Sequence, residues 1–243
     1  MSGSIVYNGH DFGGFSVATH VEGAQRVAAT TLEVPGRAGA ALLRGRVLPK
    51  ALKVRLMLDA GGKKDASEVA ALRHGAYVWL LCPKGVELAV PGDPGMTYRD
   101  AVCTDASDWS SLFEDGSCEL GFTCYDPYAH GETASSTGTA IEVGGTVATW
   151  PTVELTAVAG SAVKVEDAGS GLYVLVERSF SAGDSIVADF AVETVAVNGE
   201  DASADASADA SVASDFFALQ PGSCSLAFSG CSAHTVSWFE RWA

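Results

Sequence analysis

The sequence predicts a mainly β protein of two β-sandwich or split-barrel domains with one short helix. Short runs of β-branched and aliphatic residues recur along the chain, and clusters of Gly, Asn, Asp and Ser separate them. This pattern is typical of short strands joined by turns. Hydrophobic residues make up 47% of the 243 positions, which is enough for a real core. Of the 15 Lys and Arg side chains, 12 precede residue 131, whereas the 30 acidic side chains are split evenly around it. We therefore expect one domain at residues 1–130 and a second at residues 131–243.

The strand prediction is clearest where apolar and polar residues alternate. Leu52, Val54 and Leu56 fall on one face of a strand at residues 52–58, and charged residues fall on the other. Asn198 and Gly199 predict a two-residue hairpin turn, because both residue types accept positive φ. Further β-rich runs lie at residues 5–7, 86–90, 119–124, 152–158, 172–176, 185–190, 192–197, 224–228 and 234–239.

A helix is predicted from Asp65 to Gly75. Asp65 can cap its first turn, and Glu68 stands at the spacing of a capping box. Gly75 is expected to end the helix. The apolar run at residues 77–82 is then expected to form a strand.

Two segments of simple composition are expected outside regular structure. Residues 129–145 are rich in Ser, Thr and Gly and coincide with the change in charge, so they are predicted to be the domain boundary. Residues 202–211 repeat Ala, Ser and Asp, which favours a solvated loop. A calcium site at Asp201, Asp205 and Asp209 is the alternative, although their spacing of four lacks the pattern of an EF-hand.

The net charge of −15 excludes several classes of partner. A nucleic-acid-binding protein needs clustered Lys and Arg, and the second half of this chain has almost none. The same deficit argues against docking on anionic lipid. No run of about 18 apolar residues occurs, so membrane insertion is not expected.

The six cysteines do not form a zinc-binding pattern, because no CxxC pair occurs. No signal peptide is predicted, so we expect the chain to fold in a reducing cytoplasm with its cysteines as small buried residues at strand positions. A disulfide between Cys224 and Cys231, which flank a predicted turn, stays open.

Catalytic motifs are missing from the sequence. It has no HExxH, GxSxG or GxGxxG motif, and its five histidines are scattered. We expect no catalytic residue, no cofactor and no metal site, although a triad assembled only in space stays open. Aromatic side chains are the candidates for stacking on a sugar: Trp150, Tyr173 and Trp238.

Several short motifs, in order along the chain, resemble those of siphophage distal tail proteins, which also occur in prophages. In residues 34–39, VPGRAG, Ala38 stands where that family usually has Asp. Cys224 replaces an Asn common in the last motif, and the Ala-Ser-Asp tract is an insertion. The matching segments are residues 5–12, 34–39, 122–128, 144–152, 219–222 and 239–242.

The resemblance implies a structural tail protein and no enzyme. The first domain would be a tail-tube-like β domain with one helix that closes a hexameric ring, and the second a galectin-like β-sandwich. The expected partners are further copies of the chain, the tail tube, and the proteins of the tail tip or baseplate. The expected location is the virion tail, after assembly in the bacterial cytoplasm. Ring contacts are expected at residues 34–39, 42–48 and 77–82, with these candidate residues: Val34, Pro35, Gly36, Arg37, Gly39, Leu43 and Val47.

Two alternatives come from other classes of protein. The second domain could be a carbohydrate-binding module that recognises a host glycan, using the three aromatic residues named above. A hydrolase hidden in the second domain is the weaker alternative. Gly36 and Gly39 also have a local interpretation, in which they provide positive φ in a loop.

Overall fold

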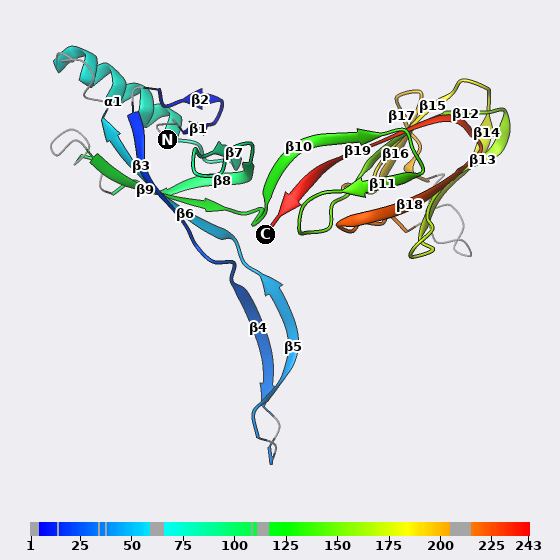
Figure 1. Cartoon of the computed structure of the whole chain (residues 1–243), viewed down its shortest axis with the longest axis horizontal. Helices are drawn as coiled ribbons and strands as arrows, with labels where there is room; N and C mark the ends of the chain where they lie inside the picture. The colour runs from blue at the N-terminus through cyan, green and yellow to red at the C-terminus, as the bar shows by residue number, and fades with distance from the viewer. Residues whose placement is uncertain are drawn as a thin grey trace. The chain divides into compact units, whose positions relative to one another are not determined.

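A computed structural model describes residues 5–13, 15–33, 35–36, 38–58, 66–107, 109–110, 117–204 and 215–243. The chain divides into two compact units, Met1–His130 with Ala243, and Gly131–Trp242. Both are built from antiparallel strands, and α1 (Ala66–Leu80) is the only complete helix among the described residues (Figure 1). The predicted mainly β class with one short helix is confirmed. No helix within the described ranges is long and apolar enough to cross a membrane.

The first unit contains one antiparallel sheet in the order β3-β6-β9-β8-β7-β1-β2. Leu52, Val54 and Leu56 on β6 are fully buried, whereas Lys53 and Arg55 between them are exposed. The predicted alternation is therefore confirmed. The strands are β1 (Val6–Tyr7), β2 (His10–Asp11), β3 (Phe15–Glu22), β6 (Lys50–Leu58), β7 (Val86–Ala89), β8 (Thr97–Asp105) and β9 (Ser117–Cys124).

The helix of the first unit is longer than predicted. It continues through Gly75 to Leu80, so the prediction of a strand at residues 77–82 is wrong. Ala76 and Leu80 lie four residues apart and are both buried. Packing of that face keeps the chain helical past Gly75, although Gly costs about 1 kcal/mol relative to Ala in a helix interior. The predicted cap, Asp65, lies outside the described residues.

A separate hairpin, which we call the arm, leaves the same unit between β3 and β6 (Figure 1). Its strands are β4 (Val27–Glu33) and β5 (Ala40–Val47), which form a two-stranded sheet of their own. Gly36 and Gly39 in its tip have φ of 83° and 79°. The interpretation that these glycines provide positive φ is confirmed.

The second unit contains two facing groups of antiparallel strands. One sheet has the order β17-β16-β15-β12-β19-β10, and the other has the order β11-β18-β13-β14. Their inward side chains form one core that includes Val153, Phe190 and Trp238. The strands are β10 (Ala129–Ser136), β11 (Ala140–Val143), β12 (Thr152–Ala157), β13 (Gly160–Asp167), β14 (Tyr173–Phe180), β15 (Ser185–Asp189), β16 (Thr194–Val197), β17 (Glu200–Asp201), β18 (Gly222–Ser229) and β19 (Cys231–Trp242).

Local predictions in this unit had mixed outcomes. Asn198 and Gly199 have φ of 51° and 83° and join Val197 to its partner Glu200, so the predicted hairpin is confirmed. Cys224 and Cys231 are free thiols, so the structure does not contain the disulfide that the sequence left open.

The two segments of simple composition contain more structure than expected. Most of residues 129–145 form two strands, β10 and β11, with buried side chains such as Ala129 on β10 and Ile141 and Val143 on β11. Small and hydroxylated residues are sufficient there because only one face of each strand is buried. Most of the Ala-Ser-Asp tract lies outside the described residues, including Asp205 and Asp209. Its first residue, Ala202, is buried, and the Asp201 carboxylate accepts hydrogen bonds from Ser203.

Candidate assembly interface

The arm has two chemically different faces, which its strand register defines. Val27 lies opposite Val47, and Thr31 lies opposite Leu42, so these four side chains share one face. Arg44 lies opposite Thr30, and Arg46 lies opposite Ala28, on the other face. One face of the arm is thus mainly apolar and the other is basic.

A β-bulge widens the apolar face near the middle of the arm. The register shifts between Thr30 and Thr31, so that Leu42 and Leu43 together oppose Thr31. A bulge of this kind places two residues of one strand against one residue of its partner and twists the hairpin. Two leucines are therefore presented side by side at this point.

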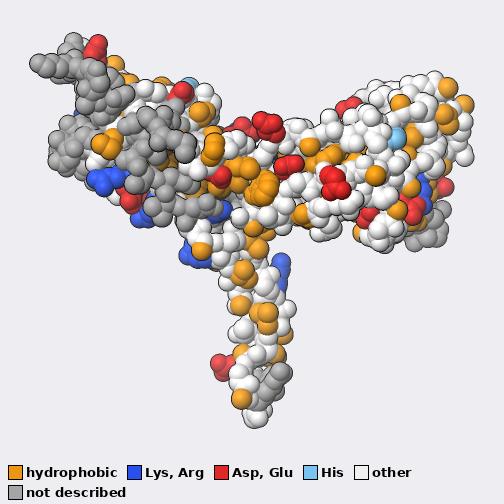
Figure 2. Space-filling model, in the orientation of Figure 1, with side chains coloured by type: hydrophobic (Ala, Val, Ile, Leu, Met, Phe, Trp, Pro, Cys, Tyr) orange, Lys and Arg blue, Asp and Glu red, His pale blue; other side chains and the backbone are white. Residues whose placement is uncertain are grey.

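The apolar side chains of the arm are exposed to solvent. Val27, Leu42 and Leu43 are 63%, 66% and 61% exposed, and Val47 is partly exposed. Figure 2 shows hydrophobic side chains along the length of the arm. Leu32, on the face that carries Arg44 and Arg46, is 51% exposed as well. Five large apolar side chains on one exposed hairpin are unusual for a surface that stays in water, and such patches mark interaction sites.

The basic face makes the arm different in charge from the rest of the chain. The arm, residues 27–47, contains three arginines and a single acidic residue, Glu33, for a net charge of +2. Because the whole chain carries −15, the remaining residues together carry −17. The arm is therefore a basic segment of an otherwise acidic chain.

The structure gathers the described candidate ring residues on the arm. Pro35, Gly36 and Gly39 lie in its tip, and Leu43 and Val47 lie on β5. Val34 and Arg37 lie outside the described residues. The sequence analysis did not identify Val27 or the hairpin itself. The sequence does contain a signal for this hairpin, which is a Pro-Gly turn between two runs that contain β-branched residues.

A second exposed apolar surface lies on α1 of the same unit. Tyr77, Val78 and Leu81 are 52%, 66% and 65% exposed. The Leu81 amide donates to the Tyr77 carbonyl at 3.1 Å, which continues the helical geometry for one residue beyond the end of α1. These three residues belong to the segment expected at a ring contact, although they are helical.

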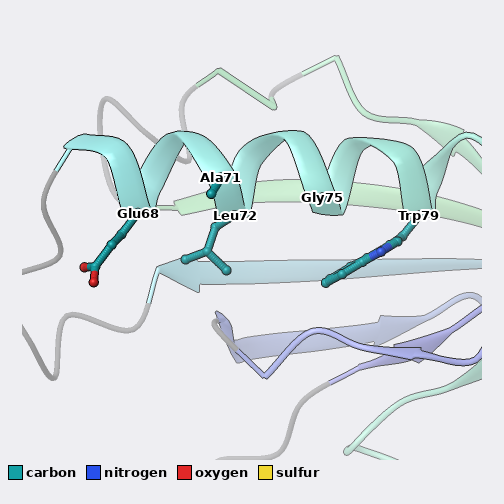
Figure 3. Close-up of a pocket in the computed structure, with 5 residues that line it drawn as sticks. All are labelled: Glu68, Ala71, Leu72, Gly75 and Trp79. Atoms are coloured by element: carbon teal, nitrogen blue, oxygen red, sulfur yellow. The ribbon is translucent and has the colours of Figure 1, made fainter.

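Aromatic packing fixes the end of α1 that carries this surface. The ring of His10 stacks on Trp79 with centroids 5.0 Å apart and planes 9° apart, and Phe12 meets Trp79 edge-on at 5.2 Å. Trp79 also borders an open hollow of about 550 Å³ along α1. Figure 3 shows Glu68, Leu72 and Trp79 extending from the same side of the helix.

The three sugar-stacking candidates do not share one surface. Trp238 lies in the core and is 4% exposed, which leaves no free ring face for a sugar. Trp150 is 44% exposed, but the Arg241 guanidinium lies 5.0 Å from its ring centroid. Tyr173 carries the Lys164 ammonium 4.3 Å from its ring centroid.

A hollow in the second unit lies between the loop after β13 and the beginning of β18. Its volume is about 460 Å³, and its lining includes Asp167, Ser170, Gln220 and Cys224. The Asp167 carboxylate accepts hydrogen bonds from its own loop, from the Gly169 and Ser170 amides and the Ser170 hydroxyl. The Cys224 thiol donates to the Gln220 carbonyl at 3.2 Å, and burial raises its pKa.

The other reactive side chains among the described residues are a histidine–aspartate pair and free thiols. His130 Nε2 and Asp126 Oδ2 are 2.7 Å apart in the first unit. Burial raises the pKa of the Cys103 thiol to about 11, which disfavours the reactive thiolate. Within the described part of the chain, no group of three or more His, Cys, Asp or Glu residues could hold a metal ion.

Comparison with known proteins gives one match to part of the chain and one to nearly all of it. Residues 144–242 match the family model of the siphovirus-type tail component, C-terminal domain. The whole chain is similar to the crystal structure of the SPP1 Dit protein, described as a paradigm of hub adsorption apparatus in phages that infect Gram-positive bacteria. The TM-score is 0.77 at 17% identity, with 99% of each chain covered. The family match and the structural match together confirm the resemblance to siphophage tail components. The structural match shows that the chain has the fold of the SPP1 Dit protein.

Two further solved structures are more distant. They are the phage P2 baseplate in its activated conformation with Ca, at a TM-score of 0.47, and with Sr, at 0.48, each at 10% identity. The matches cover 95% and 94% of this chain and 92% of each matched chain. None of the curated protein sequences matches this chain significantly.

Proposed function

We propose that this chain is a structural protein of a siphophage tail. It forms a hexameric ring at the distal end of the tail tube and links the tube to the tail tip or baseplate. The observation that carries this proposal is the fold shared with the SPP1 Dit hub protein along 99% of both chains. The family match at residues 144–242 supports it independently. The ring would stand in the virion tail after assembly in the bacterial cytoplasm.

The exposed arm supplies a physical reason for ring assembly. A closed ring requires two different surfaces on each subunit that meet around the symmetry axis. Leu42 and its apolar neighbours on the arm are costly to leave in water, because full burial of one such side chain contributes about 1.5–3 kcal/mol. Their exposure in the single chain therefore favours association.

Charge supports passage of DNA through such a ring without retention. The chain carries −15, and its exposed Lys53 forms an ion pair with Glu119 at 2.7 Å. Paired or scarce cations release few counterions from phosphates, so DNA gains little by adhering. We propose no direct recognition of nucleic acid and no membrane insertion.

The alternative is a carbohydrate-binding module in the second unit. It is supported by the hollow lined by Asp167 and Gln220, and by the Trp150 ring, which stays 44% exposed beside Arg241. Titration of the purified chain with a panel of glycans at millimolar concentration tests it. Saturable binding supports the module, and a flat response throughout the panel contradicts it.

Native mass tests the assembly proposal. Light scattering over a concentration series, with negative-stain images of the largest species, is expected to show a closed ring with a central hole. A mass that stays monomeric through the whole series contradicts self-assembly of this chain.

A matched pair of variants then tests whether the arm drives association. Leu42→Glu places a charge on the apolar face of the arm, and Val192→Glu places one in the second unit. The two side chains have matched exposure, 66% and 65%. Leu42→Glu is expected to lower the native mass, and its Tm should equal that of wild type at a concentration where both proteins are monomeric. Val192→Glu is expected to leave both the native mass and Tm unchanged. Equal effects of the two variants would exclude a special role for the arm.

A further inference from the structure

Two turns of the chain have the same sequence and nearly the same backbone conformation. The chain contains two asparagines, Asn8 and Asn198, and a glycine follows each of them. Asn8 lies in the two-residue loop that joins β1 to β2, and Asn198 lies in the two-residue loop that joins β16 to β17. The φ angles of Asn and Gly are 53° and 73° in the first turn, and 51° and 83° in the second. Both asparagines are exposed.

The backbones of the two turns also have matching surroundings. The Asn8 amide donates to the Glu87 carbonyl at 3.2 Å, and the Asn198 amide donates to the Ser185 carbonyl at 2.8 Å. Each turn is therefore held to a neighbouring strand through the same backbone group. A Cβ atom placed on the glycine of either turn would have no described atom within 4 Å. Crowding at the glycine thus does not distinguish the two turns.

The turns differ in what holds the asparagine side chain. Asn198 Oδ1 accepts from the Ser185 amide at 2.9 Å, and Asn198 Nδ2 donates to Asp184 Oδ1 at 3.0 Å. The Asn8 side chain makes no hydrogen bond to any described residue. One side-chain amide is therefore fixed through both its oxygen and its nitrogen, whereas the other lacks such a restraint within the described part of the chain.

From this difference we infer that Asn8 is a site of spontaneous deamidation and that Asn198, in the same dipeptide, is protected from it. The Gly9 backbone nitrogen attacks Asn8 Cγ, the Cγ–Nδ2 bond breaks, and ammonia leaves with the proton of the Gly9 amide. Water then opens the cyclic succinimide at one carbonyl to give aspartate, or at the other to give isoaspartate. The reaction consumes water alone, and the inference concerns a single chain, so it does not depend on the proposed ring.

The hydrogen bonds of Asn198 decide the rate because of the geometry that the attack requires. Asn Cγ must approach the nitrogen of the following residue to about 3–3.5 Å, which requires the side chain to rotate. Glycine favours this approach because it has no side chain to hinder it. At Asn198 the rotation first breaks the bonds to Ser185 and Asp184, and loss of two hydrogen bonds slows the reaction by about tenfold or more.

Reaction at Asn8 would change more than one charge. Isoaspartate carries the chain through its side-chain carbon, so it adds an atom to the backbone of a loop that has two residues. Tyr7 and His10, which pair across this turn, would then lose their register. The ring of His10 stacks on Trp79 of α1 with centroids 5.0 Å apart, so the change would extend to the packing of the helix.

Peptide mapping of one aged sample tests the inference. The purified chain is kept folded at mildly alkaline pH, and the deamidated fractions at Asn8 and Asn198 are followed together by mass spectrometry. Asn8 is expected to react about tenfold or more faster than Asn198. The control is the same chain in concentrated urea, where the two rates should converge because the dipeptides are identical. Equal rates in the folded protein, or a faster reaction at Asn198, would overturn the inference.

A pair of variants tests the cause of the protection. Asp184→Ala removes the acceptor of the Asn198 amide and is expected to raise the rate at Asn198 several-fold, while Asn8 in the same molecule keeps its rate. Val165→Ala is the control, because it removes a buried side chain from the core of the same unit without touching the turn. An unchanged rate in Asp184→Ala, or an equal rise in Val165→Ala, would refute the role of this hydrogen bond.

The consequence for the first unit has a control of its own. Asn8→Asp introduces the charge of the product without the additional backbone atom, and its Tm is expected to equal that of wild type. Aged protein enriched in isoaspartate at this position is expected to have a lower Tm than Asn8→Asp. Equal Tm values for these two proteins would contradict the effect on the turn.

Discussion

The Arg241 guanidinium covers one side of the Trp150 indole, with Cζ 5.0 Å from the ring centroid. Its Nη1 also donates to the Ala148 carbonyl at 3.0 Å. The Arg241 backbone carbonyl accepts from the Thr146 amide at 2.8 Å. One residue near the end of β19 thus holds the segment that leads into β12 through its side chain and its backbone together.

Replacing Arg241 is expected to destabilise the second unit. Arg241→Ala removes a charged hydrogen bond and a cation–π contact from a side chain that is buried, so we expect a loss of about 2 kcal/mol in the free energy of unfolding. Arg241→Lys keeps the charge but loses the planar group, so its free energy of unfolding should lie between those of wild type and Arg241→Ala. Urea unfolding measures both. Arg178→Ala, an exposed cation in the same unit, is the control, and an equal loss there would show that charge alone matters.

Gly145 is expected to tolerate no side chain. Its φ is 94°, and a Cβ atom there would lie 2.3 Å from the Arg241 carbonyl oxygen. Gly145→Ala therefore combines backbone strain of about 1–3 kcal/mol with a steric clash that displaces β19. Gly171 has φ of 75° with nothing near its Cβ position, so Gly171→Ala should cost only about 1 kcal/mol. Thermal unfolding of the two variants separates clash from strain, and equal shifts in Tm would refute the close approach.

Acid is expected to remove a stabilising contribution from Asp184. Its carboxylate accepts from Asn198 Nδ2 at 3.0 Å and from the Ser181 amide at 2.8 Å, and these hydrogen bonds lower its pKa. Because the folded pKa lies below the unfolded value of about 3.9, the contribution is complete above that value. It is lost as pH falls through the folded pKa.

The free energy of unfolding of wild type and of Asp184→Asn, measured over a range of pH, tests this prediction. The difference in stability from wild type should be constant near neutral pH and shrink below about pH 4. Glu200→Gln removes the same charge from the same sheet, so it separates net charge from hydrogen bonding. A difference that grows in acid would reverse the sign and reject the assignment.

Local sequence patterns were sufficient where the structure is decided locally. The alternation at Leu52, Val54 and Leu56 predicts a half-buried strand because the side chains of a strand alternate between its faces. Asn198 and Gly199 predict their turn because the two residues accept positive φ. In both cases the cause lies within a few residues of the element.

Patterns failed where a distant partner decides the structure. Gly75 is a poor helix residue, but burial of Ala76 and Leu80 keeps the helix intact beyond it. Residues 129–145 have little apolar character, but they become strands because neighbouring strands supply their hydrogen bonds. Neither effect is visible in a window of sequence.

The candidate interface shows the same limit. The sequence analysis placed Leu43 and Val47 at a ring contact through resemblance alone. That Val27, Leu42 and Val47 share one face follows only from the register of β4 and β5. Which surface covers that face is determined between chains and cannot be derived from either strand.

Cys103 is expected to react slowly with alkylating reagents in the folded protein. Burial raises its pKa to about 11, so only about one thiol in a thousand is ionised at pH 8. Alkylation by iodoacetamide, followed residue by residue with mass spectrometry, should be about 100-fold slower than in an unstructured peptide with an ordinary thiol pKa of about 8.5. The rate should rise about tenfold per pH unit up to about pH 10, because the thiolate is the nucleophile. A rate equal to that of the peptide would show that the thiol is ionised and exposed.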